Sequence, residues 1–330
     1  MNLNNLEKIL EAEPKYRLSQ AKSAVFKGLI EDWAETSILP SELRQQLNKS
    51  CPLSIKAETA VSKTEDVAKA RITLEDGLEI ESALMRHSDG RNTVCVSSQT
   101  GCPLNCQFCA TGKMGFKRNL EPLEIVEQAI FFARRLKKES KRITNAVFMG
   151  MGEPLLNYEN VMAAITILND KNGLNIGARH ISVSTIGIIE GIKKLAAEKI
   201  QLNLAISLHA PNNKLRDEII PINEKYPIEM IISAVDNYIV KTNRQVMFEY
   251  LLIKGVNDSD ACARELAGLM KKPLYFLNLI SYNPSGVFQA STPERTENFK
   301  SILKEMGVKF SQRYKFGQDI SAACGQFAIK

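Results

Sequence analysis

The stretch TVCVSSQTGCPLNCQFCATGKMGFKR, residues 93–118, places a short β-rich segment directly before three closely spaced cysteines. TVCVSS (93–98) has the β-branched composition of a strand. Cys102, Cys106 and Cys109 follow within eight residues, separated by three and then two residues. Parallel βα folds carry their active sites on the loops at the carboxyl ends of the strands. The stretch therefore predicts a strand that delivers three thiols to a functional rim.

The pattern of a β-rich segment followed by an amphipathic helix recurs through the rest of the chain. In residues 122–138, for example, apolar side chains recur at steps of three and four, the period of a helix with one buried face. Alternating strands and helices indicate a parallel sheet with helices outside it. Six such units predict an α/β fold, a partial (β/α)6 barrel over residues 93–330. The β-rich segments are TVCVSS (93–98), NAVFMG (145–150), HISVST (180–185), NLAISLHA (203–210), QVMFEYLLI (245–253) and LYFLNLISYN (274–283).

Two other patterns precede the barrel. Residues 1–52 show helical periodicity around Leu6–Glu11 and Leu18–Trp33, which predicts a small N-terminal helical domain. Residues 53–92 change to alternating strands, where Asp76-Gly77 is a typical hairpin turn. We therefore expect a helical domain, a β-rich connector and then the barrel.

Composition limits the class of protein. The chain has 330 residues, 44% of them hydrophobic, which is ordinary for a globular protein with one large core or two modest ones. It contains no run of about 18 apolar residues that could span a membrane. Its N-terminus lacks the apolar core of a signal peptide, so we expect a cytoplasmic protein. The net charge of +6 permits a polyanionic partner without requiring one.

The cysteine count favours chemistry over disulfides. Seven cysteines form an odd, unevenly spaced set, unlike the framework of a secreted protein. A structural zinc site or unrelated buried thiols are the alternatives for the cluster at 102–109. Structural zinc usually takes four protein ligands, and no second Cys or His pair follows these three cysteines. Three thiolates suit a 4Fe-4S cluster that keeps one iron open for another ligand.

The C-x3-C-x2-C spacing, with Phe108 before the third cysteine, resembles the radical S-adenosylmethionine (SAM) superfamily. The resemblance implies that SAM binds the open iron and is cleaved to a 5′-deoxyadenosyl radical. More specifically, the chain resembles the RlmN/Cfr family of adenine methyltransferases over nearly its whole length, with matching blocks from about residue 80 to its end and a family-like N-terminal helical module. The blocks that carry this resemblance are FMGMGEPLLN (148–157), SVSTIGII (182–189), AISLHAPN (205–212), LRDEIIPIN (215–223) and DISAACGQ (319–326).

This resemblance implies a set of cofactor-binding residues on the rim of the barrel. A plain β-to-α turn capped by Asn157 is the alternative for the Gly-Glu-Pro block, and a structural histidine is the alternative for the single His on the rim. The residues that the family assigns to SAM are Gly152, Glu153, Ser184, Ser207, Leu208, His209 and Asn283.

The resemblance also implies three catalytic residues. Cys324 matches the methyl carrier, which one SAM methylates before the radical from a second SAM activates that methyl group; two SAM molecules are used per turnover. Cys95 matches the cysteine that forms a disulfide with the carrier to release the product. Glu81 matches the proton acceptor, although the spacing between Glu81 and Cys95 is one residue longer than in the family pattern. A buried, inert thiol is the alternative for Cys324.

The expected substrate follows from the same family. RlmN-type members methylate C2 of adenosine 2503 in 23S rRNA and, in some bacteria, C2 of adenosine 37 in tRNA; Cfr-type members methylate C8 of the same rRNA base and confer antibiotic resistance. GEPLLN and SLHAPN look RlmN-like, so we expect C2 methylation by a monomer, with flavodoxin or ferredoxin as electron donor. A non-enzymatic iron-sulfur or zinc RNA-binding protein is the rival; it would not need Cys95 or Cys324.

Candidate RNA contacts are basic residues in two places. Phosphate binding uses lysine and arginine, although a solvated surface is their usual role. The candidates are Lys113, Lys117 and Arg118 after the cysteine cluster, and Lys15, Arg17 and Lys27 in the N-terminal domain.

Overall fold

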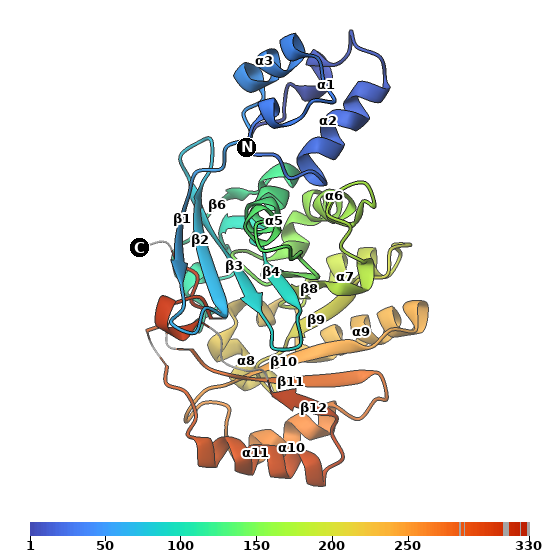
Figure 1. Cartoon of the computed structure of the whole chain (residues 1–330). Helices are drawn as coiled ribbons and strands as arrows, with labels where there is room; N and C mark the ends of the chain where they lie inside the picture. Colours follow the sequence, from blue (N-terminus) through green and yellow to red (C-terminus); the bar gives the residue numbers. More distant parts are fainter. Residues whose placement is uncertain (284, 287, 313–316, 324, 329–330) are drawn as a thin grey trace.

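One ten-stranded sheet curves through the molecule, in the order β1-β2-β3-β4-β7-β8-β9-β10-β11-β12 (Figure 1). The computed structural model describes residues 1–283, 285–286, 288–312, 317–323 and 325–328. The strands of the sheet are β1 (Ala57–Val61), β2 (Val67–Thr73), β3 (Glu79–Arg86), β4 (Asn92–Cys95), β7 (Asn145–Phe148), β8 (Ile181–Thr185), β9 (Asn203–Ser207), β10 (Val246–Leu252), β11 (Tyr275–Ser281) and β12 (Phe310–Gln312).

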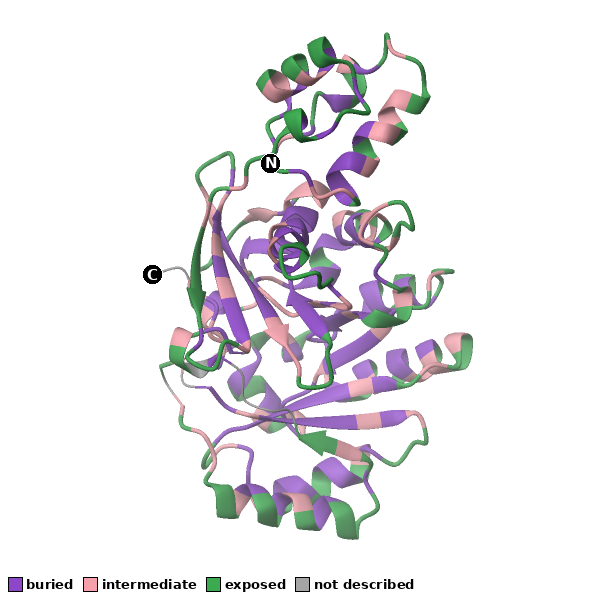
Figure 2. Cartoon of the chain, viewed as in Figure 1, coloured by how far each residue is buried: buried purple, intermediate pink, exposed green. Residues whose placement is uncertain are grey.

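The six strands expected in the barrel are confirmed and pair in parallel from β4 to β11. β12 adds a further parallel strand beside β11, which the sequence pattern did not predict. Edge strands β1 and β12 are largely exposed, so within the described residues the sheet stays open, as expected for a partial barrel (Figure 2). The helices are α5 (Pro122–Lys137), α6 (Tyr158–Asn169), α7 (Ile189–Leu195), α8 (Asn213–Ile219), α9 (Ile228–Thr242), α10 (Asp260–Leu269) and α11 (Pro293–Glu305).

The β-rich connector continues the barrel sheet. β1, β2 and β3 pair antiparallel, and β3 pairs antiparallel with β4. The predicted hairpin turn joins β2 and β3, with Gly77 at φ +82°, a conformation that glycine adopts readily. In register, Cys95 of β4 lies opposite Ala83 of β3, which lies opposite Lys69 of β2. Directly paired residues share a face of the sheet, so side chains of the connector and the barrel meet on one face.

The N-terminal helices are shorter than their periodicity indicated. They are α1 (Leu6–Ile9), α2 (Tyr16–Phe26) and α3 (Ser41–Ser50), with a 3₁₀ turn η1 (Trp33–Glu35) between the last two. The expectation of helix through Leu18–Trp33 is wrong. The N–H groups of Lys27 and Gly28 both bond to the Ser23 carbonyl, and Leu29 then takes a left-handed φ of +55°. Trp33 still reaches the core, because its indole donates to the Cys51 carbonyl at 2.7 Å.

Contacts with α5 anchor the N-terminal helices to the barrel. The amino group of Met1 pairs with the buried Glu127 at 2.8 Å. Arg134 donates to the carbonyls of Ile30 and Leu53, at 2.5 and 2.9 Å. No helix among the described residues is long and apolar enough to cross a membrane.

Candidate active site

A small hairpin holds the three-cysteine loop at the carboxyl end of β4. β5 (Gln99–Gly101) and β6 (Phe116–Asn119) pair antiparallel, and α4 (Ala110–Lys113) lies between them. Gly101 takes φ +75°, and a Cβ there would lie 1.7 Å from the Gly115 carbonyl oxygen, so only glycine fits. The Cys102 N–H donates to that carbonyl at 3.2 Å. The hairpin therefore closes the loop at its base.

The thiols of the loop share a largely buried space. Cys106 is buried, Cys102 and Cys109 are partly buried, and the Cys109 N–H donates to the Cys106 carbonyl at 3.1 Å. Burial raises the pKa of Cys102 to about 12, and the nearby charges of Glu153 and Cys109 add to the rise. Burial likewise raises the pKa of Cys106 well above its usual value. These thiols favour the protonated form unless a positive group compensates their charge.

The cysteine loop fits a cluster better than a single ion. Within the described ranges, no three His, Cys, Asp or Glu side chains converge closely enough to hold one metal ion. In a cubane cluster each cysteine binds its own iron, so its ligands need not converge on one point. The charge of Cys109 adds to the raised pKa of both Cys102 and Cys106, which places the three thiols near one another. Their arrangement is therefore compatible with the expected 4Fe-4S cluster.

Glu153 ties together two loops of the rim. Its carboxylate accepts the N–H of Leu155 at 3.0 Å and the N–H of Ile186, after β8, at 2.8 Å. Its own N–H donates to the Gln99 side chain, and burial raises the pKa of Glu153 to about 7. Gly152 has φ +95°, and a Cβ there would lie 2.5 Å from the Gln99 Cβ. The Gly-Glu pair therefore lets the backbone after β7 approach the cysteine hairpin closely.

The alternative in which the Asn157 side chain caps the next helix is wrong. Asn157 precedes α6 but makes no side-chain capping bond. Its amide donates instead to the carbonyls of Ser98 and Leu120, each at 2.8 Å. It links the loop after β7 to both ends of the cysteine hairpin.

Ser184 and Ser207 meet around a carboxylate that sequence analysis missed. The Ser184 hydroxyl donates to Glu249 on β10 at 2.6 Å, and the Ser207 hydroxyl lies 3.3 Å from the same oxygen. Glu249 is buried. The strands β8, β9 and β10 are neighbours in the sheet, which brings the three side chains together. The signal available in the sequence was a lone acidic residue inside the apolar segment QVMFEYLLI.

His209 joins the cysteine loop to the end of β9. Its ring packs edge-on against Phe108, with centroids 4.8 Å apart. Burial lowers the pKa of His209 to about 3, and the charge of Arg216 lowers it further. The neutral ring accepts the Leu251 N–H at Nδ1, so its proton resides on Nε2. His209 also takes a left-handed φ of +58°, which turns the chain sharply at the rim.

Arg216 also binds the loops of this rim through hydrogen bonds to their carbonyls. It was not singled out as a site residue from the sequence. The side chain is fully buried, and burial lowers its pKa to about 10. It donates to the carbonyls of Ile186 at 2.5 Å, Leu208 at 3.1 Å and Ser207 at 3.3 Å, and to the Asn223 side chain at 2.7 Å. One guanidinium therefore satisfies carbonyls from the loops after β8 and β9. Leu208 is also buried, so its place in the rim is set by its backbone.

Cys95 and Glu81 lie on the same face of adjacent strands. Cys95 is opposite Ala83, and Glu81 is two residues along β3 from Ala83. Both side chains are buried. Glu81 lines a cavity of about 720 Å³ between β1, β2, the cysteine hairpin and the C-terminal segment. The structure therefore brings together two residues that are 14 positions apart in the sequence.

The C-terminal segment packs directly on the cysteine loop. The carbonyl of Gly325 accepts the Ala110 N–H at 2.9 Å, and the carbonyl of Phe327 accepts the Thr111 hydroxyl at 2.7 Å. On the other side, Asp319 of the 3₁₀ turn η5 (Gln318–Ile320) accepts the Lys63 N–H at 2.8 Å, beside β1 and β2 (Figure 1). Cys324 itself lies outside the described residues. Asn283, after β11, is buried at the same end of the sheet.

Comparison with known proteins identifies the family. The model of the radical SAM superfamily matches residues 96–264. A protein of Dictyoglomus thermophilum named "Probable dual-specificity RNA methyltransferase RlmN" is 45% identical over 95% of this chain and 90% of its own length. The crystal structure of a radical SAM methyltransferase from Sphaerobacter thermophilus is 43% identical, with a TM-score of 0.94 over 99% of this chain and 97% of that one.

The chain belongs to the RlmN family of radical SAM RNA methyltransferases. A "Ribosomal RNA large subunit methyltransferase N" of Nitrosopumilus maritimus is also similar, at 41% identity over 94% of this chain and 92% of that protein. The expected family and fold are thereby confirmed. Membership implies SAM and a 4Fe-4S cluster as cofactors, and RNA as the substrate class.

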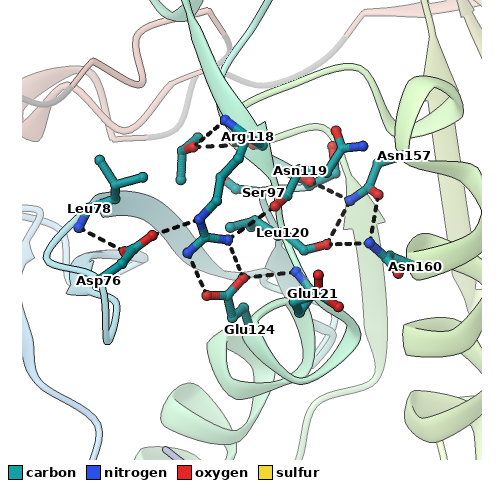
Figure 3. A network of polar contacts seen from close by, with 12 residues as sticks. Asp76, Leu78, Ser97, Arg118, Asn119, Leu120, Glu121, Glu124, Asn157 and Asn160 are labelled. Atoms are coloured by element: carbon teal, nitrogen blue, oxygen red, sulfur yellow. Dashed lines mark hydrogen bonds and ion pairs between the residues drawn. The ribbon is translucent and has the colours of Figure 1, made fainter.

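For an RlmN-family chain, the basic residues after the cysteine loop are natural candidates for RNA contacts, but Arg118 is already engaged. Its guanidinium binds Asp76 at 2.7 Å and both oxygens of Glu124 at 2.7 Å (Figure 3). The hydrogen bond with Glu124 raises the pKa of Arg118. Arg118 therefore ties the β2–β3 turn to β6 and α5. Lys113 and Lys117 are exposed, and Lys113 lines the cavity beside Glu81.

Proposed function

We propose that this enzyme methylates C2 of adenosine 2503 in 23S rRNA, and C2 of adenosine 37 in tRNA, through a methyl group carried on Cys324. The bound cluster and two SAM molecules per turnover supply the methyl group and a carbon-centred radical. Adenine C2 is a poor nucleophile, so polar transfer from a sulfonium is disfavoured and addition of a radical to carbon is the reasonable route.

The protein residues then have distinct roles. Cys102, Cys106 and Cys109 hold the cluster. Cys95 releases the product by forming a disulfide with the carrier, and Glu81 accepts the proton that leaves the substrate carbon. The rim holds SAM through the residues that the family assigns to it, which are Gly152, Glu153, Ser184, Ser207, Leu208, His209 and Asn283.

One observation carries this proposal: Cys95 and Glu81 share a face of the sheet, next to a cavity that the C-terminal segment also lines. A non-enzymatic iron-sulfur protein would have no use for a buried thiol and a buried carboxylate at that position. C2 is favoured over Cfr-type C8 because the similar proteins are named RlmN, one of them as a large-subunit rRNA methyltransferase.

Further parts of the proposal concern the setting of the reaction. Residues 1–52 form an accessory domain that grips RNA, residues 53–92 form the connector, and residues 93–330 form the catalytic barrel. The enzyme acts as a monomer in the cytoplasm and receives electrons from flavodoxin or ferredoxin.

The product tests the proposal directly. 23S rRNA and tRNA from cells that lack their own C2 methyltransferase and express this chain are digested and analysed by mass spectrometry. We expect 2-methyladenosine at position 2503 of the rRNA and position 37 of tRNA. 8-Methyladenosine would replace the C2 assignment by the Cfr-type alternative, and unmodified RNA would overturn the proposed activity.

A further inference from the structure

Lys69 holds one oxygen of Glu81 and leaves the other without a partner. The ammonium of Lys69 lies 2.8 Å from Glu81 Oε1, and the exposed fractions of the two side chains are 16% and 4%. Among the described residues, Glu81 Oε2 is buried without a hydrogen-bond partner. A buried acceptor that lacks a partner is destabilising and uncommon in native proteins, so such a group calls for a functional explanation. Glu81 lines the cavity, which is where a substrate carbon would be met.

The strand register selects Lys69 over its neighbour Arg71. Arg71 stands directly opposite Glu81, whereas Lys69 is displaced by two residues and reaches Glu81 diagonally. The Arg71 guanidinium pairs with Glu58 on β1 and lies 3.8 Å from Glu79. Glu81 is thus left to the ammonium of Lys69, although the charge of Arg71 still acts on it.

The choice of lysine fits a carboxylate that must remain reactive. Arginine usually binds a carboxylate with two parallel hydrogen bonds and would occupy both oxygens. Lysine is a compact charge that binds one oxygen and leaves the other available. The other charged groups that face the cavity are Arg71 on β2, Glu58 on β1 and Lys113 on α4.

Lys69 also contacts the segment that precedes the carrier cysteine. Its ammonium lies 3.4 Å from the carbonyl oxygen of Ser321. The same lysine therefore touches both the carboxylate and the C-terminal segment that packs beside the cysteine loop. This contact orients Lys69 from the side opposite Glu81.

We propose that Lys69 is a positioning residue that fixes Glu81 through Oε1 and directs Oε2 into the cavity as the proton acceptor. This inference rests on the proposed function of Glu81. In the step concerned, the C–H bond of the attacked carbon breaks, its proton goes to Glu81 Oε2, and its electron pair stays in the adenine ring. Lys69 touches no reacting atom.

The test compares the partial reactions of full-length, reconstituted enzyme with a 23S rRNA fragment. Lys69→Met should cleave SAM and methylate Cys324 at the native rate but accumulate covalent RNA adduct. Its product formation should be roughly tenfold slower or more, because a proton acceptor that is no longer held in place loses much of its rate. Lys69→Arg should also accumulate adduct, because arginine would occupy both oxygens of Glu81. Arg71→Met is the matched control and should not accumulate adduct.

Each contrary outcome has one meaning. A native adduct fraction in Lys69→Met would overturn the inference, as would an equal loss of all partial reactions, which indicates a purely structural role. Glu81→Gln separates this failure from that of the proposed function. If Glu81→Gln releases product at the native rate, Glu81 is not the proton acceptor and the proposed function fails at that residue. If only Glu81→Gln accumulates adduct, the role of Lys69 alone is wrong.

Discussion

The two sides of the rim treat their polar groups differently. On the barrel side, the carboxylates of Glu153 and Glu249 are buried and bound by backbone N–H groups or serine hydroxyls. On the connector side, Glu81 is equally buried but keeps one oxygen without a partner among the described residues. The barrel side is thus set before any ligand binds. The connector side retains an unsatisfied acceptor that a substrate could meet.

This contrast fits a division of labour within the family's chemistry. Bound cofactors are held best by groups whose positions are locked by packing and hydrogen bonds. A group that exchanges a proton needs an open position and an adjustable charge state. The predictions below test whether the barrel side serves the cofactor and the connector side serves the RNA.

The largest expected effect is on the cluster. Changing Cys102, Cys106 or Cys109 to alanine should abolish iron binding and SAM cleavage, because in the proposed cluster each thiolate is the protein ligand of one iron. Iron analysis, the brown absorbance and 5′-deoxyadenosine formation measure the result after anaerobic reconstitution. Cys262→Ala is the control, since Cys262 lies on α10 away from the loop and should leave all three unchanged. SAM cleavage by any single ligand variant would refute the assignment.

The next largest effect is on the covalent attachment of RNA, which should differ between variants of Cys324 and Cys95. Cys324→Ala should cleave SAM, yet form no covalent link to RNA, because the methyl carrier is missing. Cys95→Ala should form the link and fail to break it. Denaturing gels with labelled RNA distinguish the two results. Equal absence of crosslinked RNA in both variants would show that these roles do not transfer from the family.

A third, smaller effect concerns the stability of the barrel side. Arg216→Met should lower the free energy of unfolding by about 3 kcal/mol or more, because several buried acceptors lose a charged donor at once. Arg244→Met is the matched control. Arg244 is partly buried and donates to Leu202 and Asn203 at the opposite end of β9, so about 1 kcal/mol is expected.

Urea titrations of the three proteins give these values. Similar losses in Arg216→Met and Arg244→Met would mean that the rim depends less on the buried guanidinium than its hydrogen bonds indicate.

The elements that repeat along the chain could be predicted from its sequence. Periodicity predicted the six barrel strands, and the loop with the three cysteines follows β4 as expected, while its role as a cluster site stays a prediction. Periodicity failed for α2, because Ile30 and Trp33 continue the apolar pattern after the helix has ended at Phe26. Both side chains reach the core from a non-helical backbone, which periodicity does not distinguish from helix.

Contacts that depend on which strands are neighbours, and on their register, could not be predicted from the sequence. Glu249 joins Ser184 and Ser207 only because β8, β9 and β10 are adjacent in the sheet. Lys69 reaches Glu81 only because the β2–β3 register sets them two positions apart. The sequence shows a lysine in one strand and a glutamate in the next, but their contact cannot be predicted until the register is known.

The smallest expected effect is on the affinity for RNA, and it compares two adjacent basic residues of β6. Lys117 is exposed, so Lys117→Gln should weaken RNA binding a few-fold and reduce the salt dependence of affinity by the contribution of one phosphate contact, a slope of about 0.7–0.9. Arg118→Gln removes the same charge, but this guanidinium is held by Asp76 and Glu124 (Figure 3). It should lower the melting temperature and leave the salt slope unchanged. Fluorescence anisotropy with a labelled RNA fragment across a salt series measures the slopes. A loss of slope in Arg118→Gln alone would show that RNA displaces the internal carboxylates, and that the connector side is rearranged by its substrate.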